Sequence, residues 1–544
     1  MNCTSTRIPY RQTGAFSSIA MDYIDQEDSL GSFFTHPPTL QGIQKAIEAR
    51  KEFKQDRKTL VQELRKQYEG VVTSEKVKQN IEALLSPEVF TITTAHQNNI
   101  FTGPLYFIYK IVHAIRLAGH LNESLPEYRF VPVFYIGSED ADLEELDHIY
   151  LGNEKLTWKT NQTGAVGRMK CDRELLQLIG KMEGQLSVMP HGTEIIALLK
   201  KYYQEGASIA GATFGLVNHL FAEYGLVLVQ PDNAELKRMM IPVFEDDLLR
   251  QKASGIVEKT TERLEREGYK VQAHPREINL FLLEPELRER IILKGERYKV
   301  KGAGIDWSRE EMVNELHLHP ERFSPNVILR GLYQETLLPN VAFIGGAGET
   351  AYWLQLKDLF EFYKVPFPVL VLRNSFLIVE KKWQEAVSKM GFSTEDFFLP
   401  EQELMNRIVK RESRNETKLN GYPDEVEKLY SAFKKQAASI DSTLEKHVEA
   451  LRSRTIFRLQ ELEKKMLRAE KRKFADWQRQ LHATRSHLFP GDGLQERKEN
   501  FSRFYAKWGA DFLQKIYDHS LALEQEFVLL TETQISASSG KDSA

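Results

Sequence analysis

The feature that most constrains this chain is a stretch of 66 residues, 424–489, that contains neither proline nor glycine. These two residues interrupt helices most strongly, so their absence predicts helix between Pro423 and Pro490. An unbroken helix of this length would span about 100 Å, more than a compact domain can wrap. The segment is therefore expected to project or to pair with another helix.

An apolar seam within this stretch indicates how the helix pairs. Its members recur at spacings that make an eleven-residue repeat, about 3.67 residues per turn, which predicts a nearly straight or slightly right-handed coil. The partner is either the same chain, folded back as an antiparallel coiled coil, or a second copy. The seam consists of Ile440, Leu444, Val448, Leu451, Thr455, Leu459, Leu462, Met466 and Ala469.

The composition excludes several classes of protein. The chain has 544 residues and a net charge of −4, so no basic excess points to nucleic acid as a partner. Two cysteines are too few for a disulfide framework, and the N-terminus lacks the apolar region of a secretory signal. No apolar run is long enough to span a membrane. We expect a cytoplasmic, multidomain protein without a membrane partner.

Before Pro423, short β-branched or aromatic runs alternate with helical ones. VFTITT, GPLYFIYKIVHAIRLA and FVPVFYIG predict strand, helix and strand, and GLVLVQ, VAFIGG and PVLVLR predict later strands. The fold class is therefore α/β with a parallel-sheet core. Expected domains are core at 1–155, 211–250 and 321–422, insertions at 156–210 and 251–320, a helical arm at 423–535 and a disordered tail at 536–544.

Ligands of parallel sheets sit beyond the carboxyl ends of the strands, so the segments that follow strands are the candidate sites. The first has the polar run HQNN at 96–99, and Gly103 and Pro104 then begin a helix that carries Lys110. Pro at the start of a helix leaves N–H groups for an anion. Because histidine titrates near neutrality, His96 could stabilise a phosphate or act as acid or base. Alternatively, the loop only caps the helix.

The second segment is acidic. Ser138, Glu139, Asp140 and Asp142 crowd the end of a strand. Their carboxylates could bind an amine, ribose hydroxyls or Mg²⁺. Equally, Ser138 could cap a helix whose first turn favours the acidic residues.

The third segment is rich in glycine. Gly345, Gly346 and Gly348 lie between a strand and a helix, where backbone N–H groups can meet a carboxylate or phosphate. The pattern is neither a Walker motif nor a dinucleotide fingerprint, and close packing of strand and helix also explains it. The residues on one face of this helix are Glu349, Tyr352 and Gln355.

Other signals are weak. Cys171 has no identifiable partner, so a structural cysteine is favoured over a nucleophile. No histidine and cysteine spacing matches a zinc site, and no metal ligand is assigned.

Four long blocks together resemble the bacillithiol biosynthesis cysteine-adding enzymes, the cysteine ligase family. They are TAHQNNIFTGPLYFIYKI, PVFYIGSEDADLEELDH, PNVILRGLYQETLLPNVAFIGGAGETAYWLQLK and LFPGDGLQERKENFSRFYAKWG. The resemblance implies a Rossmann-like core with inserted connecting subdomains and a C-terminal coiled coil that forms homodimers. It also implies a ligase that joins L-cysteine to glucosaminyl malate. The cofactor stays open, with ATP and Mg²⁺ as candidates.

Together, the segments and the resemblance give one set of candidate site residues. Those with a catalytic role are His96, Lys110, Glu139 and Asp140. Those that bind substrate are Gln97, Asn99, Gly103, Tyr106, Ser138, Asp142, Asn326, Arg330, Gln334, Gly345, Gly346, Gly348, Glu349, Tyr352 and Gln355.

The chain departs from the family pattern at Ala95, Ala141, Gly331 and Ala347. A family histidine is missing at Ala141, which leaves His96 as the imidazole on which a mechanism would depend. Our hypothesis is amide formation from an activated cysteine carboxyl group, with Arg330 on a substrate carboxylate. The alternatives are another ATP-dependent ligase or nucleotidyltransferase on this fold, a member that has lost catalysis, and a non-enzymatic coiled-coil adaptor.

Overall fold

The computed structural model describes residues 2–415 and 418–533. Its contacts divide the chain into two compact units. The core unit combines the residues up to Ile378 with those from Gly493 onward, and the helical unit spans Val379–Asp492. The chain therefore leaves the core unit and later returns to it.

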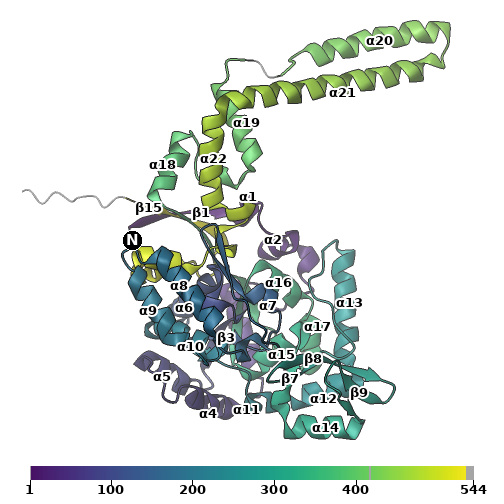
Figure 1. Cartoon of the computed structure of the whole chain (residues 1–544). Coiled ribbons are helices and arrows are strands. Elements are labelled where there is room, and N and C mark those ends of the chain that lie inside the picture. The colour runs from purple at the N-terminus through teal and green to yellow at the C-terminus, as the bar shows by residue number, and fades with distance from the viewer. Residues whose placement is uncertain (1, 416–417, 534–544) are drawn as a thin grey trace, which may run out of the picture. The chain divides into compact units, whose positions relative to one another are not determined.

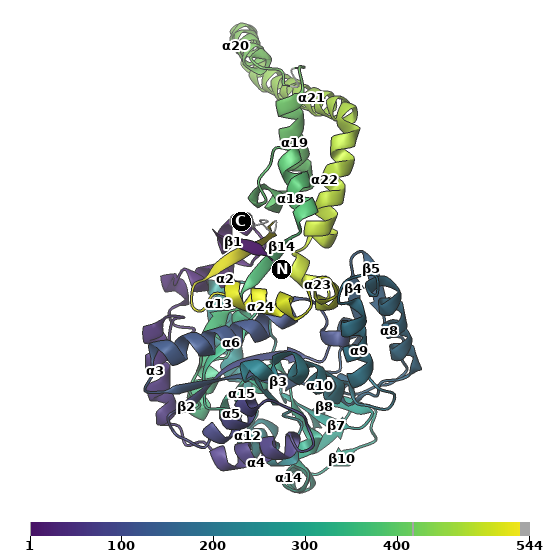
Figure 2. The ribbon, with the colours of Figure 1, turned by 90° about the vertical axis from the view of Figure 1, so that its left-hand side faces the viewer.

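A parallel five-stranded sheet lies at the centre of the core unit (Figure 2). Its strands combine β-branched and aromatic residues, and most of their side chains are buried, as in parallel sheets covered by helices. The predicted Rossmann-like α/β fold is confirmed. In spatial order the strands are β13 (Val369–Leu372), β12 (Asn340–Gly345), β2 (Val89–Gln97), β3 (Arg129–Gly137) and β6 (Val227–Val229).

The strand order places a crevice between β2 and β12. The chain passes from β2 to β3 through α6 (Tyr106–Ser124), and from β12 outward to β13 through α16 (Ala347–Leu354) and α17 (Lys357–Tyr363). Ligands of open parallel sheets bind where neighbouring connections depart in opposite directions. The first polar segment and the glycine segment flank this point.

Alternate side chains of the sheet point into two buried clusters. Ile344 and Val371 pack with apolar residues of α3 (Leu40–Lys51) and α6. Phe343 and Leu370 belong to a larger cluster that includes α15 (Val327–Leu337). Both faces of the sheet are therefore covered, which fixes the strand ends that surround the crevice.

Among the described residues, three further sheets accompany the central one. One is antiparallel, has the order β10-β9-β8-β7-β11 and includes the strands expected at INLFLL and ERYKV. Another is a hairpin, and the third has the order β1 (Cys3–Pro9), β15 (Glu526–Glu532) and β14 (Ser375–Val379). The first comprises β7 (Leu280–Glu284), β8 (Leu287–Lys294), β9 (Arg297–Val300), β10 (Asp306–Trp307) and β11 (Phe323–Pro325). The hairpin comprises β4 (His148–Leu151) and β5 (Glu154–Thr157).

The core unit contains further helices around its sheets. Cys171 is buried just before one of them, and burial raises the pKa of its thiol to about 11, which suits a structural cysteine. These helices are α1 (Tyr10–Thr13), α2 (Ser18–Ile24), α4 (Arg57–Gln67), α5 (Glu75–Ala83), α7 (Leu143–Leu146), α8 (Arg173–Leu186), α9 (Gly192–Tyr202), α10 (Ile209–Phe221), α11 (Ala234–Arg238), α12 (Ile241–Arg250), α13 (Lys252–Arg266) and α14 (Arg309–Leu318).

The segment after the helical unit belongs to the core unit. It forms α23 (Phe501–Trp508), α24 (Ala510–His519) and β15 (Glu526–Glu532), and β15 pairs with β1 (Cys3–Pro9). The sequence placed this segment in a helical arm that ends at 535. The predicted disordered tail, 536–544, lies outside the described residues.

The helical unit contains the stretch without proline and glycine. Its helices are α18 (Lys381–Lys389), α19 (Glu401–Glu412), α20 (Tyr422–Ile440), α21 (Leu444–Lys471) and α22 (Ala475–Leu488). It begins at Val379 rather than at 423, because α18 and α19 pack on α22. Within the described residues, no helix of either unit is long and apolar enough to cross a membrane.

The long stretch is not one straight helix. It turns at residues 441–443, and α20 and α21 lie side by side as an antiparallel pair (Figure 1). Asp441 causes the turn, since its carboxylate accepts from the backbone N–H and the hydroxyl of Thr443, both at 2.8 Å. Thr455, the polar member of the seam, is hydrogen-bonded to Tyr430 at 2.8 Å. The coiled coil is therefore antiparallel within this chain.

Candidate functional site

A cavity of about 820 Å³ lies beyond the carboxyl ends of β2, β3 and β12. It brings together the three segments that the sequence singled out, as the parallel sheet requires. The predicted residues that line it are His96, Gln97, Tyr106, Lys110, Ser138, Glu139, Asp140, Asp142, Asn326, Arg330, Gly346, Gly348, Glu349 and Tyr352.

Some predicted site residues lie behind the lining. Asn99 donates to the Glu145 carbonyl at 3.3 Å, and Gly103 has a φ of +65° and packs against Asn99. The N–H of Leu105, at the start of α6, donates to the Glu499 carbonyl at 2.8 Å. The N-terminus of this helix therefore meets protein at that position and not the anion that the sequence suggested.

Gln334, Gly345 and Gln355 also lie outside the lining. Gln334 is buried and donates to Glu335 at 3.0 Å, and Gly345 ends β12 beside Glu349. Gln355 accepts from the backbone N–H groups of 272 and 273, at 3.2 and 2.9 Å. Gln355 was predicted to face the crevice. It instead holds the loop at residues 272 and 273, of which residue 272 lines the cavity.

His96 ends β2, and its ring meets the edge of Tyr106 with centroids 5.2 Å apart. Its Nε2 is buried without a hydrogen-bond partner among the described residues. Burial, and then the charges of Lys110 and Arg373, hold the pKa of His96 well below its ordinary value. The expectation of an imidazole that titrates near neutrality is wrong here, because the ring stays neutral at pH 7.

Lys110 joins the two sides of the crevice. Its side chain is 2% exposed, and Nζ donates to the Ala95 carbonyl at 2.8 Å while it pairs with Glu349. The same Glu349 oxygen accepts from the N–H of Gly346 at 2.8 Å. Burial lowers the pKa of Lys110, and Glu349 opposes this shift. Lys110 therefore fixes the glycine segment, and of Ala95 it uses only the backbone carbonyl.

The acidic segment is held by several cations and amides. Glu139 pairs with Lys237 at 2.6 Å. Asp140 accepts from Gln97 and from the N–H of Ala141, the latter at 2.8 Å. Burial and the neighbouring Asp140 raise the pKa of Asp142. These carboxylates therefore form one negative flank of the cavity.

The helix-capping alternative for Ser138 is not observed. Its hydroxyl is buried without a hydrogen-bond partner among the described residues. The short helix α7 instead begins after Asp142, whose side chain makes no capping hydrogen bond.

Arginines also line the cavity and form its guanidinium flank, and three of them were missed from the sequence. Arg330 donates to the Tyr352 hydroxyl at 2.5 Å, as part of the predicted set. Arg373 lies 5.0 Å over the Tyr106 ring, and Arg497 is exposed at the cavity. Arg288, from β8, lies 3.9 Å from Asp140. Arg373 is the last residue of the predicted strand PVLVLR, so the rule that found the other segments could have found it.

The cavity thus offers carboxylates and guanidinium groups within one space. This arrangement suits small molecules that carry both an ammonium and a carboxylate. Across residues 2–415 and 418–533, no group of three or more His, Cys, Asp or Glu is arranged to hold a metal ion. The carboxylates of Glu139 and Asp140 instead contact Lys237, Gln97 and Arg288.

Family models match nearly the whole chain. Residues 1–374 match "Bacillithiol biosynthesis BshC, N-terminal Rossmann-like domain", and residues 376–532 match "Bacillithiol biosynthesis BshC, C-terminal coiled-coil domain". The second match contains the helical unit together with the segment that returns to the core unit.

Curated relatives match over similar lengths. "Putative cysteine ligase BshC" of Flavobacterium psychrophilum is 38% identical over 96% of this chain and 98% of its own. The protein of the same name from Cytophaga hutchinsonii is 36% identical over 94% and 96%. A solved structure, titled as a putative arginyl tRNA synthetase from Campylobacter jejuni, covers 81% of this chain and 97% of its own, with a TM-score of 0.21 and 11% identity. That last similarity supports no conclusion.

Proposed function

Since the chain belongs to the BshC family of cysteine ligases in bacillithiol biosynthesis, we propose that it joins the carboxyl group of L-cysteine to the amine of glucosaminyl malate. The observation that carries this proposal is the pairing of a carboxylate flank with a guanidinium flank in one cavity of about 820 Å³. Cysteine and glucosaminyl malate each combine an amine with carboxylates. The carboxylate flank would therefore bind amines of the substrates, and the guanidinium flank would bind their carboxylates.

The negative flank suits the amine of the sugar. Glu139 and Asp140 would hold it, and the neutral His96 ring offers an unpartnered Nε2 as hydrogen-bond acceptor for the attacking amine. Arg330 and Arg497 would hold the malate carboxylates, since guanidinium groups bind carboxylates in a bidentate way. Placing the amine against the acyl carbon would supply part of the acceleration.

Amide formation requires an activated cysteine carboxyl group, because a free carboxylate is a poor acyl donor. A nucleoside triphosphate would supply the leaving group. The test is to incubate purified protein with cysteine and glucosaminyl malate, with and without ATP and Mg²⁺, and to follow the thiol product, AMP and ADP by mass spectrometry. Product that requires ATP supports the full proposal. Product without ATP contradicts activation by ATP, and no product with any donor contradicts ligation.

We also propose that the protein is a homodimer through the helical unit. The pair α20 and α21 leaves large apolar side chains in solvent, including Leu429, Phe433 and Phe457, at 50%, 45% and 55% exposure. In a monomer these apolar side chains stay in contact with water, whereas a second copy of the chain would bury them. The cytoplasm stays the expected compartment.

A further inference from the structure

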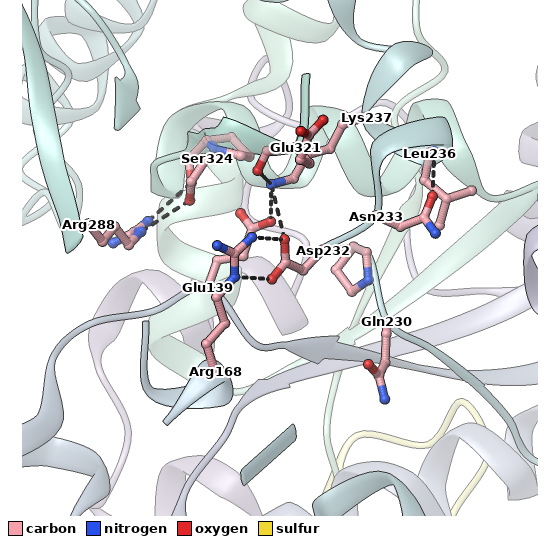
Figure 3. Close-up of polar contacts among 12 residues, drawn as sticks. Glu139, Arg168, Gln230, Asp232, Asn233, Leu236, Lys237, Arg288, Glu321 and Ser324 are labelled. Atoms are coloured by element: carbon pink, nitrogen blue, oxygen red, sulfur yellow. Dashed lines mark hydrogen bonds and ion pairs between the residues drawn. The ribbon is translucent and has the colours of Figure 1, made fainter. Parts of the chain in front are cut away.

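A buried lysine, absent from the predicted site, contacts the acidic flank of the cavity. Lys237 lies on α11, and its side chain is 0% exposed. Its Nζ lies 2.6 Å from Glu139 Oε1, 3.0 Å from the Glu321 carbonyl and 3.4 Å from Asp232 (Figure 3). An ammonium group has three donors. With three acceptors in reach, Lys237 has no donor left for a ligand.

Asp232 is itself held from the other side. Arg168 donates two hydrogen bonds to its carboxylate, each of 2.7 Å. Arg168, Asp232, Lys237 and Glu139 therefore form a row of alternating charges with no net charge, as Figure 3 shows. Such rows tolerate burial because each charge has a partner, and they lose stability when one member is removed.

Glu139 is the end of this row that lines the cavity. One carboxylate oxygen, Oε1, contacts Lys237. Within the part of the chain that the structure describes, Oε2 has no hydrogen-bond or ion-pair partner. Glu139 therefore has one oxygen held by protein and one free for a substrate donor.

We propose that Lys237 is a positioning residue that holds the Glu139 side chain by its Oε1, with Oε2 available to the amine of the sugar substrate, while Arg168 and Asp232 hold Lys237. This inference rests on the proposed function. Lys237 acts only through Glu139, since its own donors are used.

The other groups that face Glu139 do not replace Lys237. The cations are Arg168 and Arg288, of which the first is bound to Asp232 and the second lies nearer Asp140. Tyr135 and Tyr333 also face Glu139, and burial keeps their pKa values well above the ordinary value. Without Lys237, the Glu139 carboxylate is therefore expected to lose the cation that fixes its position.

The test compares Lys237→Met, Glu139→Gln and the double variant. For Lys237→Met, we expect the KM for glucosaminyl malate to rise by at least about tenfold, because Glu139 is no longer held in place, while Lys237→Arg should restore part of the loss. Glu139→Gln should also raise KM, and the double variant should match Glu139→Gln alone. Additive losses, or an unchanged KM in Lys237→Met, would overturn the proposal.

A substrate-free measurement separates this inference from the proposed function. Carbon-13 resonances of labelled glutamate carboxyl groups, assigned with Glu139→Gln, report the surroundings of the Glu139 carboxylate. At pH 7 we expect Lys237→Met to shift the Glu139 resonance, and Lys237→Arg, which keeps the charge, to leave it closer to the wild-type position. An unchanged Glu139 resonance in Lys237→Met would contradict the proposal, even in a protein that makes no product.

Discussion

Arg373 donates a hydrogen bond of 2.7 Å to Glu496, and both side chains are buried, at 6% and 0% exposure. Glu496 also accepts from the Ser375 hydroxyl and the Phe376 N–H, at 3.1 and 3.2 Å. The pair joins the end of β13 to the segment that follows the helical unit. It therefore holds Arg373 at the cavity and brings the neighbouring Arg497 to the same place.

Glu496→Gln should destabilise the core unit strongly. The substitution keeps the shape but leaves Arg373 as a buried charge without a counter-ion, at a cost of about 3–5 kcal/mol in the free energy of unfolding. Hydrogen exchange of the β13 amides in urea measures this. The control is Glu82→Gln, which removes an exposed pair with Arg65 and should cost less than about 1 kcal/mol. Equal effects of the two substitutions would contradict the assigned role.

The buried His113 is expected to make the protein less stable in acid. The ring is fully buried, Nε2 lies 2.8 Å from the Ala522 carbonyl, and Nδ1 accepts from the Asn374 N–H at 3.1 Å, so only the neutral ring fits. Burial lowers its pKa to about 4, against about 6.5 when unfolded. Between these values the unfolded chain binds the proton. The free energy of unfolding therefore falls as the pH falls through this window, by about 3 kcal/mol in total.

Urea unfolding at pH 7 and 4.5 tests this for His113, with His113→Gln as the control. Glutamine can donate to Ala522 and accept from Asn374 without titrating. The variant should lose less stability between the two pH values than the wild type. The same loss in both proteins would show that His113 does not carry the effect.

Phe457→Glu should weaken self-association. Phe457 is 55% exposed on α21, and a charge there cannot be buried against a second copy without a partner. Sedimentation equilibrium should show a dimer for the wild type and for the control Gln460→Glu, an exposed polar position on the same helix. A wild-type monomer, or a Phe457→Glu dimer as stable as the control, would contradict the proposed dimer.

Local signals in the sequence were enough to predict the sheet and much of the cavity. The β2, β3 and β12 strands carry apolar, β-branched runs, and polar side chains follow each one, so a parallel sheet brings these ends together. The sequence left open whether the long stretch folds back on itself or pairs with a second copy, and it did not predict the position of the turn at 441–443, because no proline or glycine marks it. Asp441 and Thr443 were the available signal, since such side chains compete for backbone hydrogen bonds.

Other parts of the site depend on tertiary structure alone. Arg288 reaches the cavity from a β-hairpin in a predicted insertion, and Lys237 from the short helix α11. No spacing in the chain relates either residue to Glu139 or Asp140. The low pKa of His96 has the same origin, because its burial and its cationic neighbours come from separate strands and helices.

The most direct test of the account is the rate of cysteine addition to glucosaminyl malate by His96→Ala. His317→Ala, at a half-exposed histidine outside the cavity lining, is the matched control. With the thermal unfolding of both variants unchanged, we expect the turnover of His96→Ala to fall by about 10² to 10⁴ and that of the control to stay at the wild-type level. Undiminished turnover in His96→Ala would contradict the assignment of the reaction to this cavity.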